Sequence, residues 1–295
     1  MRRPTPLPVE LDPAGFGVQT AAESHVLRAR LRAADLTAPF HGVRRVGSPT
    51  TIEELALAYA ARMTTRGRFT HTTSAALLGL RMPEGFRERE LHVGVPRPAR
   101  APRGRGVIGH QVEPALPALR QVGLPLTPAV ETWLQCATLL AADDVIIMGD
   151  GLVRRFRPCA TMAELAAAVS QAAGCRGATI LRKALTSIRP GTDSARETML
   201  RLIVVRAGFP EPEVNGPIVN RYGATIAHGD LVFRGQKVIL EYEGRQHADD
   251  ERQFSIDIAR LDEIMEEGWR VIRVDKRLMA ARATLLGKIK TALAR

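Results

Sequence analysis

Two apolar strands joined by a four-residue link restrict the fold of this chain more than any other segment. The strands are "HGDLVF" (228–233) and "KVILEYE" (237–243), and the link "RGQK" is typical of a tight hairpin turn. Stepping outward from the turn predicts the pairs Phe233–Val238 and Leu231–Leu240. The apolar run "VIL" further predicts that the second strand is buried on both faces.

The segments around this hairpin alternate between helical and extended patterns. The sequence predicts helices over 194–207, 251–267 and 281–294, an extended piece over 217–222 and a strand over 269–274. This order indicates an α/β sandwich with a mixed sheet. The stretch "SIRPGTDS" has the Pro and Gly of a linker, so we place a domain boundary there and expect the α/β domain to span 187–295.

The predicted hairpin register brings acidic side chains together. It places Asp230 opposite Glu241, with Cβ atoms roughly 5 Å apart. Two anions at that separation repel, so either one carboxyl is protonated or a cation lies between them. A hard cation such as Mg²⁺ suits such a pair. The alternative is that the acids lie on a solvated sheet face, which fits poorly with Ile239 on the same side of the strand and with the apolar run "VIL".

Other polar residues could join this pair. Glu197 either completes an S-x-x-E capping box at the start of its helix or faces the acids, and both roles are compatible. Gln246 and His247 follow the strand, where His247 could act as a base, orient water, bind phosphate or have no role in the chemistry. Arg260 lies off the apolar stripe of its helix, either as a solvent-exposed charge or close to a phosphate.

The first part of the chain, 1–186, reads as a helix-rich α+β domain. The pattern predicts helices over 20–36, 51–63, 70–80 and 161–174, with further apolar helix over 127–155. The strand "RELHVGVP" is expected to form a hairpin with "VIGHQVEP". We find no clustered His, Cys or Asp in this part of the sequence, so it suggests no chemistry.

Basic residues favour a polyanionic partner. The net charge is +11, which favours DNA or RNA, although the excess of arginine over lysine also fits a GC-rich genome. The loop "RPARAPRGRG" between the two strands of the first part is either a basic finger for phosphates or a solvated hairpin tip. Its four arginines are Arg97, Arg100, Arg103 and Arg105.

Composition also sets the expected compartment. The three cysteines are widely spaced and form no CxxC pair, which argues against a zinc ribbon and fits a reducing cytosol. The start "MRRPTPLPVELDP" lacks the apolar region of a signal peptide, and no run approaches the ~18 apolar residues of a membrane helix. We therefore expect a cytoplasmic protein that does not bind a membrane.

Residues 190–276 resemble a known family. The pattern D-x10-E-x-E-G-x-Q-H, followed by "DIARLDEIMEEGWRVIRV", is similar to the PD-(D/E)xK nuclease superfamily, and within it to uncharacterised bacterial proteins related to very-short-patch-repair endonucleases. The resemblance implies a restriction-endonuclease-like α/β/α sandwich and Mg²⁺-dependent cutting or nicking of DNA. Two positions depart from the pattern: Gly229 replaces the usual proline, and Glu243 replaces the usual lysine.

The resemblance also implies roles for individual residues. Mg²⁺, for which Mn²⁺ can substitute, would be held by Asp230, Glu241 and the backbone carbonyl of Tyr242, with Glu197 directly or through water. Glu243, Gln246 or His247 would position the attacking water. The first part of the chain is similar to antitoxins of abortive-infection toxin–antitoxin systems, which begin with a winged helix.

The expected function is hydrolysis of DNA phosphodiesters, in repair or defence, with no small-molecule cofactor and with a homodimer compatible with the sequence. One alternative is a non-catalytic, antitoxin-type DNA-binding regulator with a decayed nuclease fold. A second alternative, a glycosidase with paired carboxylates, needs an aromatic-rich sugar cleft. The two Trp and three Tyr of the chain argue against that.

Overall fold

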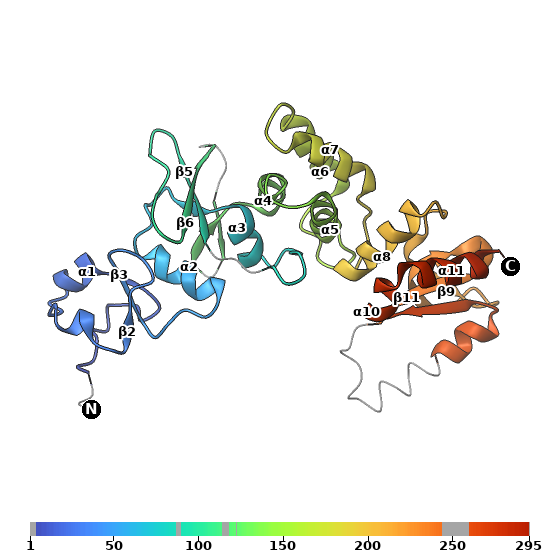
Figure 1. The fold of residues 1–295 in the computed structure, drawn as a ribbon, viewed down its shortest axis with the longest axis horizontal. Helices are drawn as coiled ribbons and strands as arrows, with labels where there is room; N and C mark the ends of the chain where they lie inside the picture. Colours follow the sequence, from blue (N-terminus) through green and yellow to red (C-terminus); the bar gives the residue numbers. More distant parts are fainter. Residues whose placement is uncertain (1–3, 87–89, 114–117, 122, 244–259, 295) are drawn as a thin grey trace. The chain divides into compact units, whose positions relative to one another are not determined.

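The structure of the protein is a computed structural model, which describes residues 4–86, 90–113, 118–121, 123–243 and 260–294 (Figure 1). Contacts divide the chain into two compact units, which are unit 1 (Met1–Ala141 and Ala168–Leu181) and unit 2 (Ala142–Ala167 and Arg182–Arg295). Both contain helices and sheet, so the mixed α/β class is confirmed. Because 142–167 belongs to unit 2, this division is not a single cut in the sequence, and the boundary at 187 stays a prediction.

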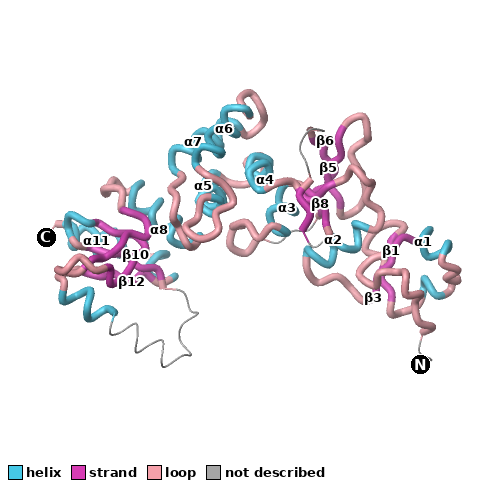
Figure 2. The backbone as a smooth tube through the Cα atoms, turned by 180° about the vertical axis from the view of Figure 1, so that it is seen from behind, coloured by secondary structure: helices cyan, strands magenta, loops and turns pink. Residues whose placement is uncertain are grey.

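Unit 1 contains two small β-sheets (Figure 2). The strand order of the first is β1-β3-β2, from Phe16–Gly17, Val43–Val46 and Leu36–Thr37. The second has the order β6-β5-β4-β8-β7, from Val107–Val112, Leu91–Pro96, Arg68–Phe69, Leu124–Leu126 and Leu119–Gln121. The helices are α1 (Val18–Glu23), η1 (Arg30–Arg32), α2 (Ile52–Ala60), α3 (His71–Leu77) and α4 (Ala129–Cys136). The predicted helices over 51–63 and 70–80 correspond to α2 and α3.

The predicted helix over 20–36 is wrong, because the chain leaves the helical path after α1. His25 has a φ of 59°, in the left-handed region, and the Val26 N–H donates to the Ala21 carbonyl at 2.9 Å. This six-to-one hydrogen bond, with that from His25 to Ala22, is a Schellman helix end. Leu31 is then free to join a small apolar cluster with Ala21, which a continuous helix would not allow.

The predicted hairpin of "RELHVGVP" with "VIGHQVEP" is also wrong. Strands β5 and β6 pair in parallel, with Leu91 opposite Val107 and Pro96 opposite Val112. The segment 97–106 therefore runs back along the strands and is a crossover connection instead of a hairpin tip. Gly109 allows this path, since a Cβ there would lie 2.0 Å from the carbonyl oxygen of Pro102 in the connection.

Three helices lie between α4 and α8 (Ala195–Arg206): α5 (Ala142–Leu152), α6 (Met162–Gln171) and α7 (Ala178–Ser187). Gly174, with a φ of 84°, comes shortly after α6, as expected for a glycine that ends a helix. The predicted helical segments over 127–155 and 161–174 thus correspond to α4, α5 and α6.

Unit 2 is built on a four-stranded mixed sheet. The strand order is β12-β11-β10-β9, from Arg270–Val274, Val238–Tyr242, Thr225–Phe233 and Glu213–Val219. Strands β9, β10 and β11 are antiparallel, whereas β11 and β12 are parallel. The described helices of the unit include α8 (Ala195–Arg206), α10 (Lys276–Ala280), α11 (Arg282–Leu293) and the helical residues 260–266.

Both faces of this sheet are covered (Figure 1). Leu231 and Leu240 pack with α8, α10 and α11 on one face. Val232 and Ile239 pack on the other face with Ile264 and Trp269, which come from the helical residues 260–266 and the turn after them. The three residues of "VIL" in β11 are therefore all buried, which confirms the predicted central strand.

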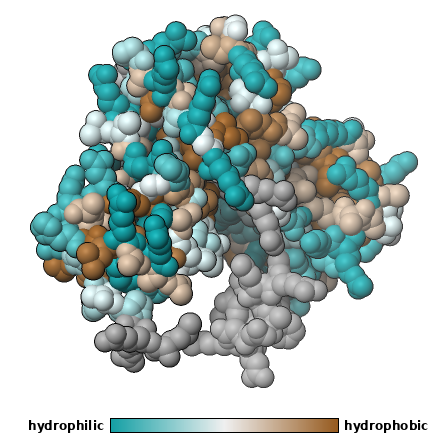
Figure 3. Space-filling model, turned by 60° about the vertical axis from the view of Figure 1, so that its left-hand side comes forward, coloured by the Kyte–Doolittle hydropathy of each residue, from teal (hydrophilic) through white to brown (hydrophobic). Residues whose placement is uncertain are grey.

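In the described part of the chain, no helix combines the length and the apolar character that crossing a membrane requires. Hydrophilic residues, drawn in teal, occupy much of the face shown in Figure 3, with smaller hydrophobic patches between them.

Candidate functional site

The β10–β11 hairpin has the predicted register. Phe233 lies opposite Val238 and Leu231 opposite Leu240, and the paired residues end there. Since side chains alternate, the next residues outward, Asp230 and Glu241, belong to the opposite face from the two leucines. The hairpin thus brings these two acids together at the end of its paired region, on the face that residues 260–266 cover.

Asp230 is held by the backbone of the neighbouring strand. The Tyr242 N–H donates to Asp230 Oδ2 at 2.8 Å. Burial, then the negative charges of Glu197 and Glu241, raise the pKa of the Asp230 carboxyl to about 7, although the Tyr242 hydrogen bond and the charge of Arg260 lower it in part. Asp230 is therefore a carboxyl with two other carboxylates close enough to raise its pKa.

Glu197 combines the two roles that the sequence suggests. Its N–H donates to the Ser194 side chain at 3.1 Å, so Ser194 caps α8. Its Oε2 accepts hydrogen bonds from the Asp193 N–H at 2.8 Å and from the Asn215 side chain at 2.9 Å. Glu197 is buried, yet its charge acts on Asp230, so the first turn of α8 lies beside the acid pair.

Arg260 lies directly at the site. Its Nη2 donates to Glu241 Oε1 at 2.9 Å and to the carbonyl of His228 at 3.0 Å. The Arg260 side chain is 39% exposed and that of Glu241 is 17% exposed. A guanidinium that holds a carboxylate and still reaches solvent can also contact a phosphate oxygen. Arg260 is thus an ion-pair partner of Glu241, and its predicted contact with a phosphate stays a prediction.

The remaining predicted residues of this site are Glu243, Gln246, His247 and Tyr242. Glu243 forms an ion pair with Arg273 of β12, and both side chains are exposed. Gln246 and His247 lie outside the described residues, so their predicted roles stay predictions. Tyr242 contributes its N–H to Asp230, and the ring of Tyr242 lies under the guanidinium of Arg196, 5.8 Å from its centre.

The donor set fits a hard divalent cation. Carboxylate and carbonyl oxygens are the ligands of Mg²⁺, which needs only one or two carboxylates beside waters and a substrate phosphate. The acids lie more loosely than a closed cage requires: among described residues, only three histidines form a group of three possible ligands within 4.8 Å of one another. The hairpin therefore brings together two possible carboxylate ligands, Asp230 and Glu241, and the charge of Glu197 also acts on Asp230.

A basic region lies in unit 1. The arginines of the connection 97–106 are exposed, as predicted, although not on a hairpin tip. Arg103 and Arg105 line a pocket of about 1090 Å³ together with Arg44 and Arg62, and no acidic residue lines it among the described ones. The four predicted arginines thus divide into two beside this pocket and two, Arg97 and Arg100, elsewhere on the connection.

Sequence reasoning missed the group of His71, His92 and His110, which are far apart in the chain but close in space. The signal that could have found them is the register of β5 and β6. The expected hairpin hid this signal, because it differs from the observed parallel pairing, which places His110 opposite Gly94 and on the side of His92.

Comparison with known proteins supplies no activity. No model of a known protein family matches the chain. Two uncharacterized proteins of Mycobacterium tuberculosis, from the strains CDC 1551 / Oshkosh and ATCC 25618 / H37Rv, are similar to it. Each is 26% identical over 204 residues, which cover 68% of this chain and 72% of the relative.

Proposed function

We propose that unit 2 is a divalent-metal-dependent nuclease that hydrolyses phosphodiester bonds in DNA. The observation that supports this most is the partly buried Asp230 carboxyl, which the Tyr242 N–H holds at the end of the hairpin, where the charges of Glu197 and Glu241 help to raise its pKa to about 7. Acids are arranged in this way where a cation completes the site. The mixed sheet with helices on both faces and the spacing of Asp230 and Glu241 also support a restriction-endonuclease-like sandwich.

In this proposal Asp230, Glu241 and the Tyr242 carbonyl hold Mg²⁺, and Glu197 contributes directly or through water. When bound, Mg²⁺ supplies a water of lowered pKa and a positive charge beside the phosphate. The Tyr242 N–H fixes Asp230 in place. Arg260 orients Glu241 and binds a phosphate oxygen with its remaining donors. Glu243, Gln246 or His247 positions the attacking water.

Gly229 replaces the proline that is usual in the nuclease pattern, and the packing around it gives a steric reason. A Cβ at this position would lie 2.5 Å from Ile239 Cγ2 and 3.0 Å from Val232 Cγ2. Proline or any other side chain there would displace the apolar cluster behind the acid pair. The glycine is therefore compatible with a working site and reflects the close packing of β10 against β11 side chains.

The basic connection of unit 1 supports DNA as the substrate. Exposed arginines without acids around them attract a polyanion irrespective of its sequence. Arg103 and Arg105, with Arg44 and Arg62, provide four guanidinium groups around one pocket. We propose that this pocket contacts the phosphate backbone, and that DNA binding and hydrolysis reside in separate units of the chain.

A second candidate function is DNA binding without catalysis. Two ion pairs favour it: Arg260 with Glu241, and Arg273 with Glu243. These arginines already neutralise two of the acids without a metal ion. A decayed nuclease that keeps its fold as a regulator would have this arrangement, and it would retain the basic pocket of unit 1.

Incubation of supercoiled plasmid with purified protein and Mg²⁺ or Mn²⁺ distinguishes the two functions. We expect wild type to nick or cut the plasmid, and Glu241→Gln, which keeps a partner for Arg260, to lose this activity. Glu213→Gln removes an acid of an exposed ion pair in the same sheet and serves as the matched control that still cuts. Cleavage by Glu241→Gln would overturn the proposed site, and binding without cleavage by wild type would support the regulator.

A further inference from the structure

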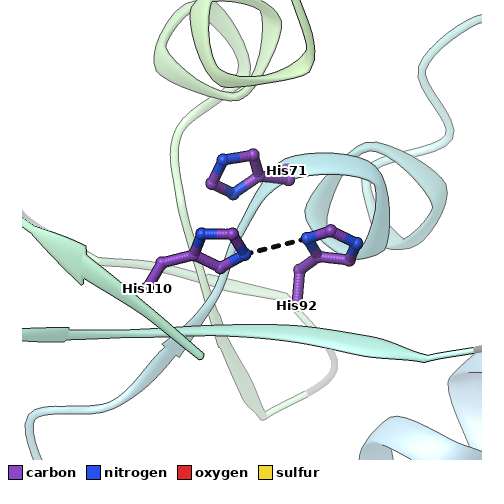
Figure 4. A group of neighbouring side chains, drawn as sticks. All are labelled: His71, His92 and His110. Carbon is purple, nitrogen blue, oxygen red and sulfur yellow. Dashed lines mark hydrogen bonds between the residues drawn. The ribbon is translucent and has the colours of Figure 1, made fainter. Parts of the chain in front are cut away.

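Three of the seven histidines of the chain meet in unit 1 (Figure 4). His71 is the first residue of α3, His92 lies in β5 and His110 lies in β6. Each offers a ring nitrogen, and these nitrogens all lie within 4.8 Å of one another. His92 Nδ1 and His110 Nε2 are only 2.9 Å apart, so one ring donates a hydrogen bond to the other.

The sheet register brings these side chains to one face. His110 is opposite Gly94, two residues beyond His92, so both histidines point to the same side of the parallel pair. Gly94 has no side chain on that side, and a Cβ there would lie 2.6 Å from Thr70 Cγ2. The glycine therefore permits the close approach of Thr70, and with it of His71 at the start of α3.

All three rings are suited to act as ligands. Burial, followed by the effects of His110 and His92, lowers the pKa of His71 to about 3. Burial and His110 lower the pKa of His92 to about 4, and burial lowers the pKa of His110. The rings are neutral at pH 7, the protonation state that metal coordination requires.

His71 is held in an unusual conformation. Its φ of 49° lies in the left-handed region, and its N–H donates to the Gln135 side chain at 3.0 Å. His71 Nδ1 lies 3.0 Å from Thr70 Oγ1, so a proton on Nδ1 can point to that hydroxyl and leave Nε2 as the ligand atom. Backbone strain of this kind is often retained where it positions a functional side chain.

We propose that these histidines form a binding site in unit 1 for a transition-metal ion of the zinc class. Imidazole nitrogens suit Zn²⁺, Co²⁺ and Ni²⁺, and not the Mg²⁺ of the acid pair. Zn–N bonds of ~2.0–2.1 Å in a tetrahedral site separate ligand nitrogens by roughly 3.3 Å. His92 and His110 need to open only slightly from 2.9 Å to reach this separation.

His71 completes the site by turning. Its ring now stacks on His110, with ring centres 3.8 Å apart and planes at 24° (Figure 4). Coordination swings Nε2 of His71 out of this stack and towards the ion, while Thr70 remains within reach of Nδ1. Three protein ligands leave a fourth position for water or a small anionic or carbonyl ligand, as in zinc sites that bind a substrate.

The test is titration of chelator-treated full-length protein with Zn²⁺ by calorimetry and with Co²⁺ by visible absorbance. We expect one ion per chain and a tetrahedral Co²⁺ spectrum without the near-ultraviolet band of a thiolate ligand. His92→Gln and His110→Gln should each weaken binding by more than ~100-fold, since even residues that only orient ligands contribute ~10–100-fold. His41→Gln, an exposed histidine of the same unit, is the matched control.

Two further controls assign the ion to these residues. Asp230→Asn should leave Zn²⁺ binding unchanged, which separates this site from the acid pair in unit 2. A second control needs no variant. In wild-type protein labelled with ¹⁵N-histidine, Zn²⁺ should shift the NMR signals of three imidazole rings. The proposal is overturned if Zn²⁺ does not bind or if its binding persists in folded His92→Gln and His110→Gln. It is also overturned if Zn²⁺ leaves the NMR signals of these imidazoles unchanged.

Discussion

Replacing Asp230 by Asn should stabilise the metal-free protein, although it removes a residue of the proposed site. The pKa of the folded-state carboxyl lies at about 7, against an ordinary value of 3.8. At ~1.4 kcal/mol per pKa unit, ionising Asp230 in the folded state costs about 4 kcal/mol. Asn carries no charge, and its side-chain oxygen can still accept the hydrogen bond of the Tyr242 N–H, so most of this cost disappears.

The stability that Asp230→Asn gains over wild type increases as the pH rises. Below about pH 4 both the folded and the unfolded protein hold the proton, so the Asp230 carboxyl contributes nothing. Between about pH 4 and 7 the unfolded chain has lost the proton and the folded protein keeps it, so wild-type stability falls as the pH rises. Above about pH 7 the loss is complete. We expect Asp230→Asn to match wild type near pH 4 and to be more stable by about 2–4 kcal/mol near pH 8.

Urea unfolding at several pH values measures this difference. Of the two tryptophans in the chain, Trp269 belongs to the cluster beneath the acid pair. In a Trp133→Phe background, its fluorescence reports on unit 2. Excess Mg²⁺ should stabilise wild type near pH 8 and leave Asp230→Asn unchanged. A stability difference that is the same at all pH values, or a variant less stable near pH 8, would refute the reasoning.

Two further predictions concern DNA binding and the core of unit 2. Replacing Arg103 and Arg105 by Ala should make the slope of log K against log salt less steep by about 2, since each phosphate contact contributes ~0.9. Fluorescence anisotropy with a labelled duplex measures this, and Arg28→Ala, an exposed arginine of the same unit, should not change the slope. Arg201→Met should lower the free energy of unfolding by about 3–5 kcal/mol, because it leaves a buried acid without its cation. Arg206→Met, on the same helix but in an exposed ion pair, should cost less than ~1 kcal/mol by urea unfolding, and equal losses would contradict the burial argument.

The parts of the fold that the sequence predicts well are those set by neighbouring residues. The β10–β11 hairpin follows from a four-residue link and the alternation of apolar residues, and the observed pairs agree with the expected ones. The N-cap at Ser194 likewise depends on a residue only three positions away, Glu197. Local hydrogen bonds and strand alternation are enough to place Asp230 beside Glu241.

The parts of the fold that the sequence predicts poorly depend on contacts between residues far apart in the chain. Nothing in the apolar pattern of 20–36 shows that His25 adopts a left-handed conformation, which ends α1. The pairing direction of β5 and β6 depends on whether the connection 97–106 crosses back, which its own residues do not reveal. The histidine group follows from that direction and from α3 packing on the sheet, so sequence reasoning could not assemble it.

Two aspartates of unit 2, Asp150 and Asp230, have contrasting environments. Asp150 is fully buried, and it accepts hydrogen bonds from the Arg189 N–H, the Thr198 hydroxyl and the Arg201 guanidinium. Burial still raises its pKa, but a cation faces its carboxylate.

Asp230 has a different environment, since two carboxylates add to the effect of burial in raising its pKa, and Arg260 is held by Glu241. Evolution of stability alone would favour a neutral side chain at this position. The protein satisfies the buried Asp150 with an arginine but leaves the partly buried Asp230 beside two acids, and this contrast supports our proposal that a bound cation completes the site.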